Sequence, residues 1–209
     1  MTDKVNKIRF YAHAASTEAH DLSTLFNKTQ GGGWRDMIGQ AVNPSTGPTI
    51  PTWTQMAGGP FYAYQYGIND QQWFLYHIQH DYAPGTDMYL HCHWLSDGTS
   101  TGLVNWQFTW TFAKGFNQGA PSTYTDIATG AVTGIEEAGS GTAYRHMTSE
   151  IAVAIADTDF EVDGILMVNV KRIASTGAAN GDSIFVLMSD VHYQSNTFNT
   201  KNRQPDFYT

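Results

Sequence analysis

Residues 71–112 switch between two side-chain faces over three successive segments, and this period of two constrains the fold more than any other feature. In the last segment one face carries only large apolar side chains, which are Val104, Trp106, Phe108, Trp110 and Phe112. Each segment ends in Gly, Pro, Asp or Ser residues, which favour turns. Such alternation is typical of half-buried antiparallel strands. The sequence therefore predicts three consecutive β-strands here.

The middle segment places two histidines side by side. His91 and His93 share one face, while Leu90, Cys92 and Trp94 share the opposite, apolar face. At ~3.3 Å per residue, the two imidazoles are roughly 6.5–7 Å apart along the strand. We expect Cys92 to be buried as packing on the apolar face, where a thiol is usually inert. Whether the histidine pair holds a metal ion is the main chemical question that the sequence poses.

Further alternation and turn signals predict an all-β protein of about seven or eight strands. Strands are predicted at residues 61–66, 165–173 and 183–193, with a weaker one at 143–155. Turns rich in Gly, Asp and Ser at 97–102 and 177–182 are of the kind that join hairpins. The last strand is expected to place four apolar residues on one face: Phe185, Leu187, Val191 and Tyr193. This pattern indicates an antiparallel β-sandwich or jelly roll over residues 61–197.

The two ends of the chain are less regular. Residues 1–60 carry several prolines and glycines and predict an irregular N-terminal arm, with one helix candidate at Ser16–Asn27. Residues 198–209 are polar and predict an extended C-terminal tail. An arm of this kind either lies on a neighbouring molecule or wraps its own domain, and the sequence leaves both alternatives open.

Composition narrows the functional classes. The chain has 209 residues, which suits one domain, and a formal net charge of -8 with no basic run. Nucleic acid and anionic membranes are therefore not expected as partners. One cysteine cannot form an internal disulfide. The first residues lack the apolar core of a signal peptide, and no apolar run is long enough to span a bilayer, so we expect a soluble protein made in the cytosol.

The histidine pair allows two interpretations. His91-Cys92-His93, with Gly85 before it and Asp97 after it, partly resembles the first motif of the cupins, with Asp in place of the cupin Glu. In that case His91, His93, Asp97 and His192 would hold Zn, Fe or Mn. The alternative is a polar or aromatic layer, or a subunit interface, without any cofactor. No G-x-S-x-G motif or paired acids point to other catalysis, so an enzyme is not expected.

A second resemblance covers residues 73–197. The residues that carry it form an H-x-H-W segment, a V-x-W strand and a closing D-x-H-Y-Q strand; they are Gln79, His80, Tyr82, Gly85, Thr86, Asp87, His91, His93, Trp94, Val104, Trp106, Asp190, His192, Tyr193 and Gln194. This pattern resembles a family of uncharacterised β-sandwich virion proteins of tailed bacteriophages. The chain departs from it after Gln194, where it continues Ser195-Asn196-Thr197-Phe198.

The resemblance implies a non-enzymatic virion component, assembled in the host cytoplasm, that serves in capsid decoration, the head-tail junction or the tail. We expect a homo-oligomer, specifically a trimer, in contact with other capsid or tail proteins. The metal ligands, where an ion is bound, are expected to be His91, His93 and His192. An interface or buried polar site is expected to contain five further residues: His80, Asp87, Trp94, Asp190 and Tyr193.

Overall fold

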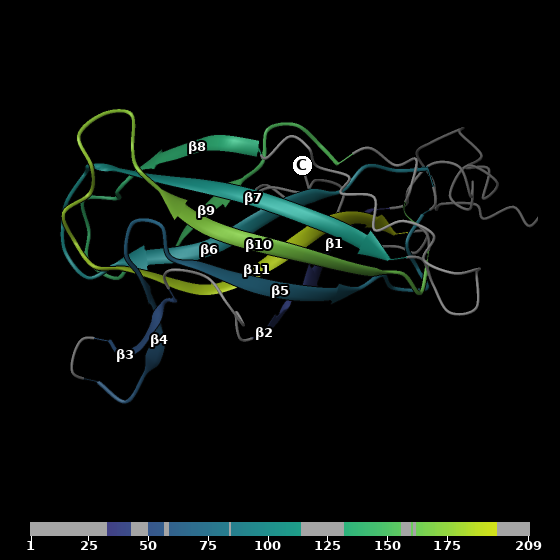
Figure 1. The fold of residues 1–209 in the computed structure, drawn as a ribbon, viewed down its shortest axis with the longest axis horizontal. Helices are drawn as coiled ribbons and strands as arrows, with labels where there is room; N and C mark the ends of the chain where they lie inside the picture. Colours follow the sequence, from purple (N-terminus) through teal and green to yellow (C-terminus); the bar gives the residue numbers. More distant parts are fainter. Residues whose placement is uncertain are drawn as a thin grey trace, which may run out of the picture.

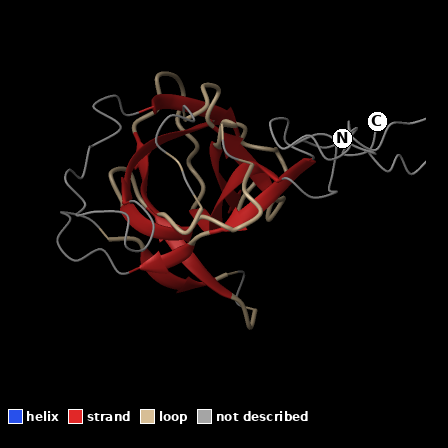
Figure 2. Ribbon diagram, turned by 90° about the vertical axis from the view of Figure 1, so that its right-hand side faces the viewer, coloured by secondary structure: helices blue, strands red, loops and turns tan. Residues whose placement is uncertain are grey.

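The structure is a computed structural model that describes residues 33–42, 50–56, 59–83, 85–113, 132–155, 160 and 162–195. Every regular element in these ranges is a strand, as Figure 2 shows. The strands are β1 Gly33–Ile38, β2 Gln40–Val42, β3 Thr52–Gln55, β4 Tyr62–Tyr66, β5 Gln71–His77, β6 Tyr89–Ser96, β7 Leu103–Ala113, β8 Val132–Ala138, β9 Met147–Glu150, β10 Ile165–Ile173 and β11 Ile184–Ser195. The helix predicted at 16–27 and the tail at 198–209 lie outside the described residues.

The strands form two antiparallel sheets packed face to face (Figure 1). One sheet has the order β3-β4-β11-β6-β9, with β1 also paired to β11, and the other has the order β2-β5-β10-β7-β8. The predicted all-β sandwich is therefore confirmed. Within the described ranges, no helix is long and apolar enough to cross a membrane.

The order of the strands is jelly-roll-like. β4 pairs with β11, β5 with β10, β6 with β9 and β7 with β8, and these four pairs alternate between the two sheets. The strands from β4 to β11 therefore form one long antiparallel two-stranded ribbon. The chain reverses between β7 and β8, and the ribbon is folded into the two sheets. Jelly rolls use the same device to limit exposed sheet edges.

The two turns predicted to join hairpins do not do so. Residues 97–102 connect β6 to β7, and residues 177–182 connect β10 to β11, so each connection passes from one sheet to the other. The turns instead bind each other: the amide of Ser100 donates to Asp182 and the amide of Ser183 donates to Asp97, both at 2.8 Å. The hairpin prediction failed because turn residues indicate only that the chain reverses direction. They do not determine which sheet the next strand joins.

The core lies between the sheets and contains the predicted apolar faces. The core contains Leu166, Val168 and Val170 of β10 and the alternate apolar side chains of β7, which are Val104, Trp106, Phe108, Trp110 and Phe112. From the opposite sheet come Leu90, Cys92 and Trp94 of β6, as the alternation predicts. Since these residues point inward, the histidines of β6 must point to the outer face of the same sheet.

The face prediction for the last strand is wrong in its first half. A β-bulge interrupts the pairing of β11 with β6 between Val186 and Met188. Ile184 and Val186 face the main core before it, and Val191 and Tyr193 face the core after it. Leu187 is 43% exposed, and Phe185 packs in a small separate cluster. The extra residue of a bulge shifts the period of two by one position, so a single parity cannot describe the strand.

The sheets begin before residue 61. β1, β2 and β3 all lie within residues 1–60, for which the sequence predicts an irregular arm. They are short, and each takes its register from a longer strand, namely β11, β5 and β4. Short edge strands carry too few residues to display a period of their own. Figure 1 shows the β3–β4 hairpin projecting from one end of the sandwich.

Candidate functional site

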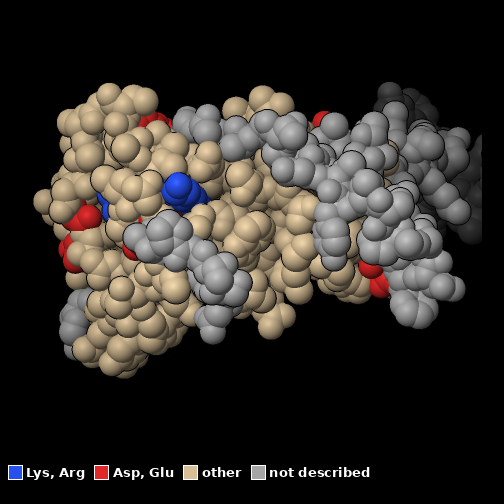
Figure 3. Space-filling model, viewed as in Figure 1, with Lys and Arg blue, Asp and Glu red and all other residues tan. Residues whose placement is uncertain are grey.

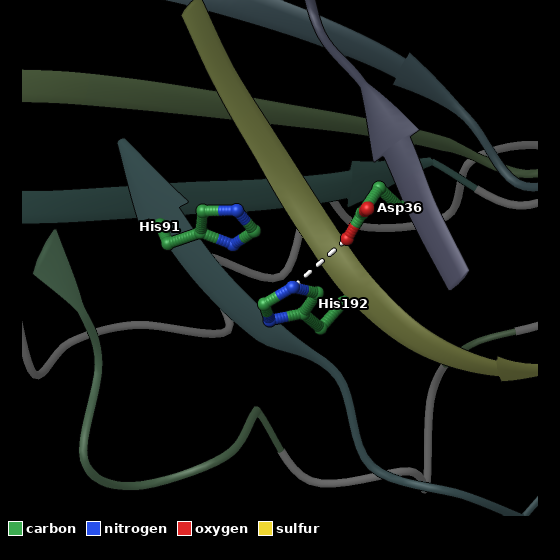
Figure 4. A group of neighbouring side chains, drawn as sticks. All are labelled: Asp36, His91 and His192. Atoms are coloured by element: carbon green, nitrogen blue, oxygen red, sulfur yellow. Dashed lines mark ion pairs between the residues drawn. The ribbon is translucent and has the colours of Figure 1, made fainter. Parts of the chain in front are cut away.

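A cluster of His, Asp and Glu side chains occupies the outer face of the six-stranded sheet. The register places Asp190 of β11 opposite His91 of β6, and His91 opposite Glu150 of β9. Asp36 of β1 lies opposite His192 of β11. Four strands therefore bring these polar residues into one patch, and Figure 4 shows three of them on β1, β6 and β11.

His91, His93 and Asp190 form the centre of the cluster. The Nε2 atoms of His91 and His93 are 3.0 Å apart, and Asp190 Oδ2 is 3.0 Å from His93 Nε2. His91 Nε2 also contacts the same carboxylate. His91 is only 1% exposed and Asp190 is buried, whereas the side chain of His93 is 18% exposed. The three donor groups thus converge at a buried point that His93 connects to the surface.

The backbone beneath His91 is fixed from the core side. The hydroxyl of Ser189 donates to the carbonyl of His91 at 2.8 Å, and the hydroxyl of Tyr76 donates to Ser189 Oγ at 2.7 Å. All three residues are buried. A buried chain of satisfied hydrogen bonds holds the strand that presents the imidazole in one position.

His192 is held between two carboxylates. Its Nε2 lies 2.8 Å from Asp36 Oδ1 and its Nδ1 forms an ion pair with Glu150. Burial alone would lower the pKa of His192, but the hydrogen bonds to Asp36 and Glu150 outweigh it and raise the pKa to about 9. The ring stacks on His91 with centroids 4.0 Å apart. His192 is therefore an imidazolium at neutral pH and has no free nitrogen lone pair.

At the centre of the cluster, the pKa values of His91 and Asp190 are both lowered. Burial lowers the pKa of His91, and the neighbouring Asp190 only partly offsets this, so His91 is neutral near pH 7. Burial would raise the pKa of Asp190, but hydrogen bonds from His91 and His93 outweigh it and lower the pKa to about 2. The centre therefore offers a neutral imidazole and an ionised carboxylate, which are the forms that bind metal ions.

Two overlapping groups in the described residues have ligand atoms within 4.8 Å of one another: His91, His93 and Asp190, and Asp36, His91 and His192. The second group includes the imidazolium of His192, which is a poor ligand. The first group contains no such residue. His91 Nδ1 is buried and has no hydrogen-bond partner. This nitrogen is on the other side of the ring from Nε2, which is the atom that faces His93 and Asp190.

The structure brings together only part of the predicted site. His91, His93, Asp190 and His192 lie in the cluster, but Asp97 lies in a turn, where it accepts the amide of Ser183.

Of the remaining predicted site residues, Trp94 is in the core and donates to Ser149 at 2.8 Å, and Tyr193 donates to Asp81 at 2.9 Å. His80 and Asp87 are exposed. These four residues therefore do not form one interface site with the cluster.

Three residues of the cluster were not predicted. Asp36 and Glu150 come from β1 and β9, and His146 lies just before β9 with its Nε2 2.6 Å from His93 Nδ1. All three are more than 40 residues away from His91 in the sequence, and Asp36 and Glu150 lie on strands whose sequences show no clear period of two. Only the register between strands reveals them, and the sequence alone does not contain it.

The β3–β4 hairpin carries a second distinctive surface. Trp53 is 58% exposed and stacks on Tyr62 with centroids 6.2 Å apart, and Phe61, which precedes Tyr62 in the chain, is 69% exposed. Ile50, which precedes β3, is also exposed. Neither strand contains a charged residue, and the corresponding region of the space-filling view shows no charged atoms (Figure 3).

Comparison with known proteins gives similarities of fold alone. No family model and no curated protein matches the chain. Among solved structures, a xylan-binding module, CBM15, is similar over 79% of this chain and 93% of its own, with 12% identity and a TM-score of 0.37.

Two further structures are similar over a small part of their own length. Dimeric latent PorU from Porphyromonas gingivalis matches 79% of this chain with 8% identity and a TM-score of 0.37, but this chain spans only 13% of PorU. An exo-beta-1,3-galactanase from Phanerochaete chrysosporium matches 74% with 11% identity and a TM-score of 0.33, and this chain spans 29% of it.

Proposed function

We propose that this protein is a non-enzymatic structural component of a tailed-bacteriophage virion, present as a homotrimer that contacts other capsid or tail proteins. The proposal starts from the resemblance in the H-x-H-W, V-x-W and D-x-H-Y-Q segments. Several of these residues serve the fold: Tyr82, Trp94 and Trp106 are buried in the core, and Gly85 has a φ of 83°, a conformation that favours glycine. Residues that serve the fold, and not catalysis, are compatible with a structural protein that acts by binding other proteins.

The observation that carries the proposal is the exposed apolar surface of the β3–β4 hairpin. Trp53, Phe61 and Tyr62 are aromatic and largely exposed, although burying one such side chain stabilises a protein by about 1.5–3 kcal/mol. Contiguous exposed apolar surface of this kind marks interaction sites. β3 also lies at the end of the described order of its sheet, where a further strand can pair. We assign this surface to contact with a neighbouring copy of the chain.

Light scattering coupled to size-exclusion chromatography tests this assignment. The wild-type protein is expected to have three times the chain mass of 23.1 kDa. Trp53→Ser combined with Tyr62→Ser should lower the mass toward that of one chain. Tyr144→Ser, which removes an exposed aromatic ring between β8 and β9, is the matched control and should leave the trimer intact. A wild-type monomer at tens of micromolar would refute the homotrimer.

The virion assignment has its own test. Mass spectrometry of purified particles from the phage that encodes this chain should detect it at a copy number of a structural protein. Its absence from purified infectious particles would refute the assignment, whatever the oligomeric state of the isolated chain.

Metal binding is the second candidate function, and the convergence of His91, His93 and Asp190 favours it. The ligand set differs from the cupin-like set of the sequence analysis, because Asp190 replaces Asp97 as the carboxylate. Elemental analysis of the purified protein tests this candidate directly.

A further inference from the structure

We infer that His91, His93 and Asp190 bind one divalent transition-metal ion per chain in a structural role, and that His146 orients His93 for this purpose. The inference rests on the second candidate function and is independent of the virion assignment. It extends that candidate by naming the class of ion, the residue that positions a ligand and the effect of binding on the fold.

The spacing of the three donor groups suits a single small ion. The Nε2 atoms of His91 and His93 are 3.0 Å apart, and Asp190 Oδ2 is 3.0 Å from the second of them. Ligands of a tetrahedral Zn²⁺ ion with bonds of about 2.0–2.1 Å are about 3.3–3.4 Å apart, and those of an octahedral ion are about 3.0 Å apart. The two separations in the cluster are close to both values, and His91 Nε2 and the Asp190 carboxylate, which are in direct contact, would have to move apart slightly to admit the ion.

His146 determines which nitrogen of His93 is available. His93 Nδ1 lies 2.6 Å from His146 Nε2, and the two rings stack with centroids 4.8 Å apart. When His93 donates its Nδ1 proton to His146, Nε2 gives up its hydrogen bond to Asp190 and its lone pair becomes available to an ion between His91 and Asp190. Histidines that bind metals generally donate their other ring proton to a fixed acceptor in this way. His146 is therefore a positioning residue and not a ligand.

The donor types indicate the class of ion. Imidazole suits zinc, iron, copper and nickel, whereas calcium and magnesium prefer sites made only of oxygen atoms. Two imidazoles and one carboxylate thus point to a first-row transition metal such as Zn²⁺. The partial exposure of His93 provides a route for the ion to enter from solvent.

Binding would join two strands far apart in the sequence. His91 and His93 lie on β6, and Asp190 lies on β11, which is the neighbour of β6 in the sheet. An ion that binds only the folded chain stabilises it in proportion to the logarithm of its concentration over the Kd. We expect one bound ion per chain and a rise in the unfolding temperature when Zn²⁺ is added to chelator-treated protein.

Isothermal titration of chelator-treated full-length protein with ZnCl₂, together with elemental analysis and thermal unfolding, tests the inference. The variants are His93→Gln and His146→Gln. His77→Gln is the matched control, since His77 also pairs with a carboxylate, Asp163, but lies on β5 in the other sheet. His93 is chosen over His91 because its side chain is less buried, so the variant is more certain to fold, and circular dichroism checks this.

One equivalent of Zn²⁺ per chain in the wild type and in His77→Gln, with binding lost in His93→Gln, supports the inference. His146→Gln should weaken binding about 10–100-fold without changing the stoichiometry. No binding to the wild type at 100 µM Zn²⁺, or unchanged binding in His93→Gln, overturns it. One ion per three chains also overturns it, because the site would then lie between copies. None of these outcomes depends on whether the chain is found in virions, so the two proposals fail separately.

Discussion

Replacing His192 by Gln should destabilise the protein at neutral pH and have little effect at high pH. The pKa of His192 rises from 6.5 in the unfolded chain to about 9 in the folded protein. A raised pKa means that the stabilisation is complete below pH 6.5 and is lost as the pH rises through 9. A rise of the pKa from 6.5 to about 9 corresponds to about 3 kcal/mol.

Urea unfolding followed by tryptophan fluorescence at pH 6, 7.5 and 9.5, in the presence of a chelator, measures this difference. His192→Gln should be less stable than the wild type by about 3 kcal/mol at pH 6, and the gap should nearly close at pH 9.5, where neutral His192 no longer balances Asp36 and Glu150. His77→Gln is the control, because His77 and Asp163 are exposed and such pairs contribute about 1 kcal/mol or less. A gap of constant size across this pH range would refute the reasoning.

Two further predictions test the fold. Gly102→Ala should cost about 1–3 kcal/mol, because the added Cβ would lie 2.5 Å from a backbone oxygen of the facing turn. Gly181→Ala, with no atom within 4 Å, is its control and should be neutral in the same denaturation assay. Leu187→Ser should change stability by less than about 0.5 kcal/mol, whereas Val186→Ser should cost about 2–4 kcal/mol. Equal costs at these two positions would contradict the faces assigned to Val186 and Leu187.

The sequence was sufficient for the faces of β7 and β10, although not for the first half of β11. Val104 to Phe112 and Leu166 to Val170 were placed correctly, because a strand exposes alternate residues to alternate sides whatever its partners are. The pairing of strands was not accessible in the same way. β6 pairs with β11, which lies about a hundred residues later, and no local signal distinguishes this partner from the next strand along the chain.

In the candidate site, too, some residues could be found from the sequence and others could not. His91 and His93 were found from their spacing on one strand, and Asp190 and His192 came from the resemblance. Glu150 could not be found, because it contacts the cluster only through the register of β9 with β6. His192 was expected to be a metal ligand, yet both of its nitrogens face carboxylates. A residue type and its spacing do not show whether a histidine is neutral or charged.

The position of the cluster in the rolled ribbon gives the proposed ion a specific role. β6 and β11 are not partners within the ribbon, where β6 pairs with β9 and β11 with β4. They become neighbours only when the ribbon rolls up, and their contact closes a long loop at a cost in chain entropy. Long-range strand pairings of this kind are slow to form. An ion held by β6 and β11 would stabilise the rolled form over the open ribbon. If the contact between β6 and β11 is completed only after the transition state for folding, removal of the ion should speed unfolding more than it slows folding.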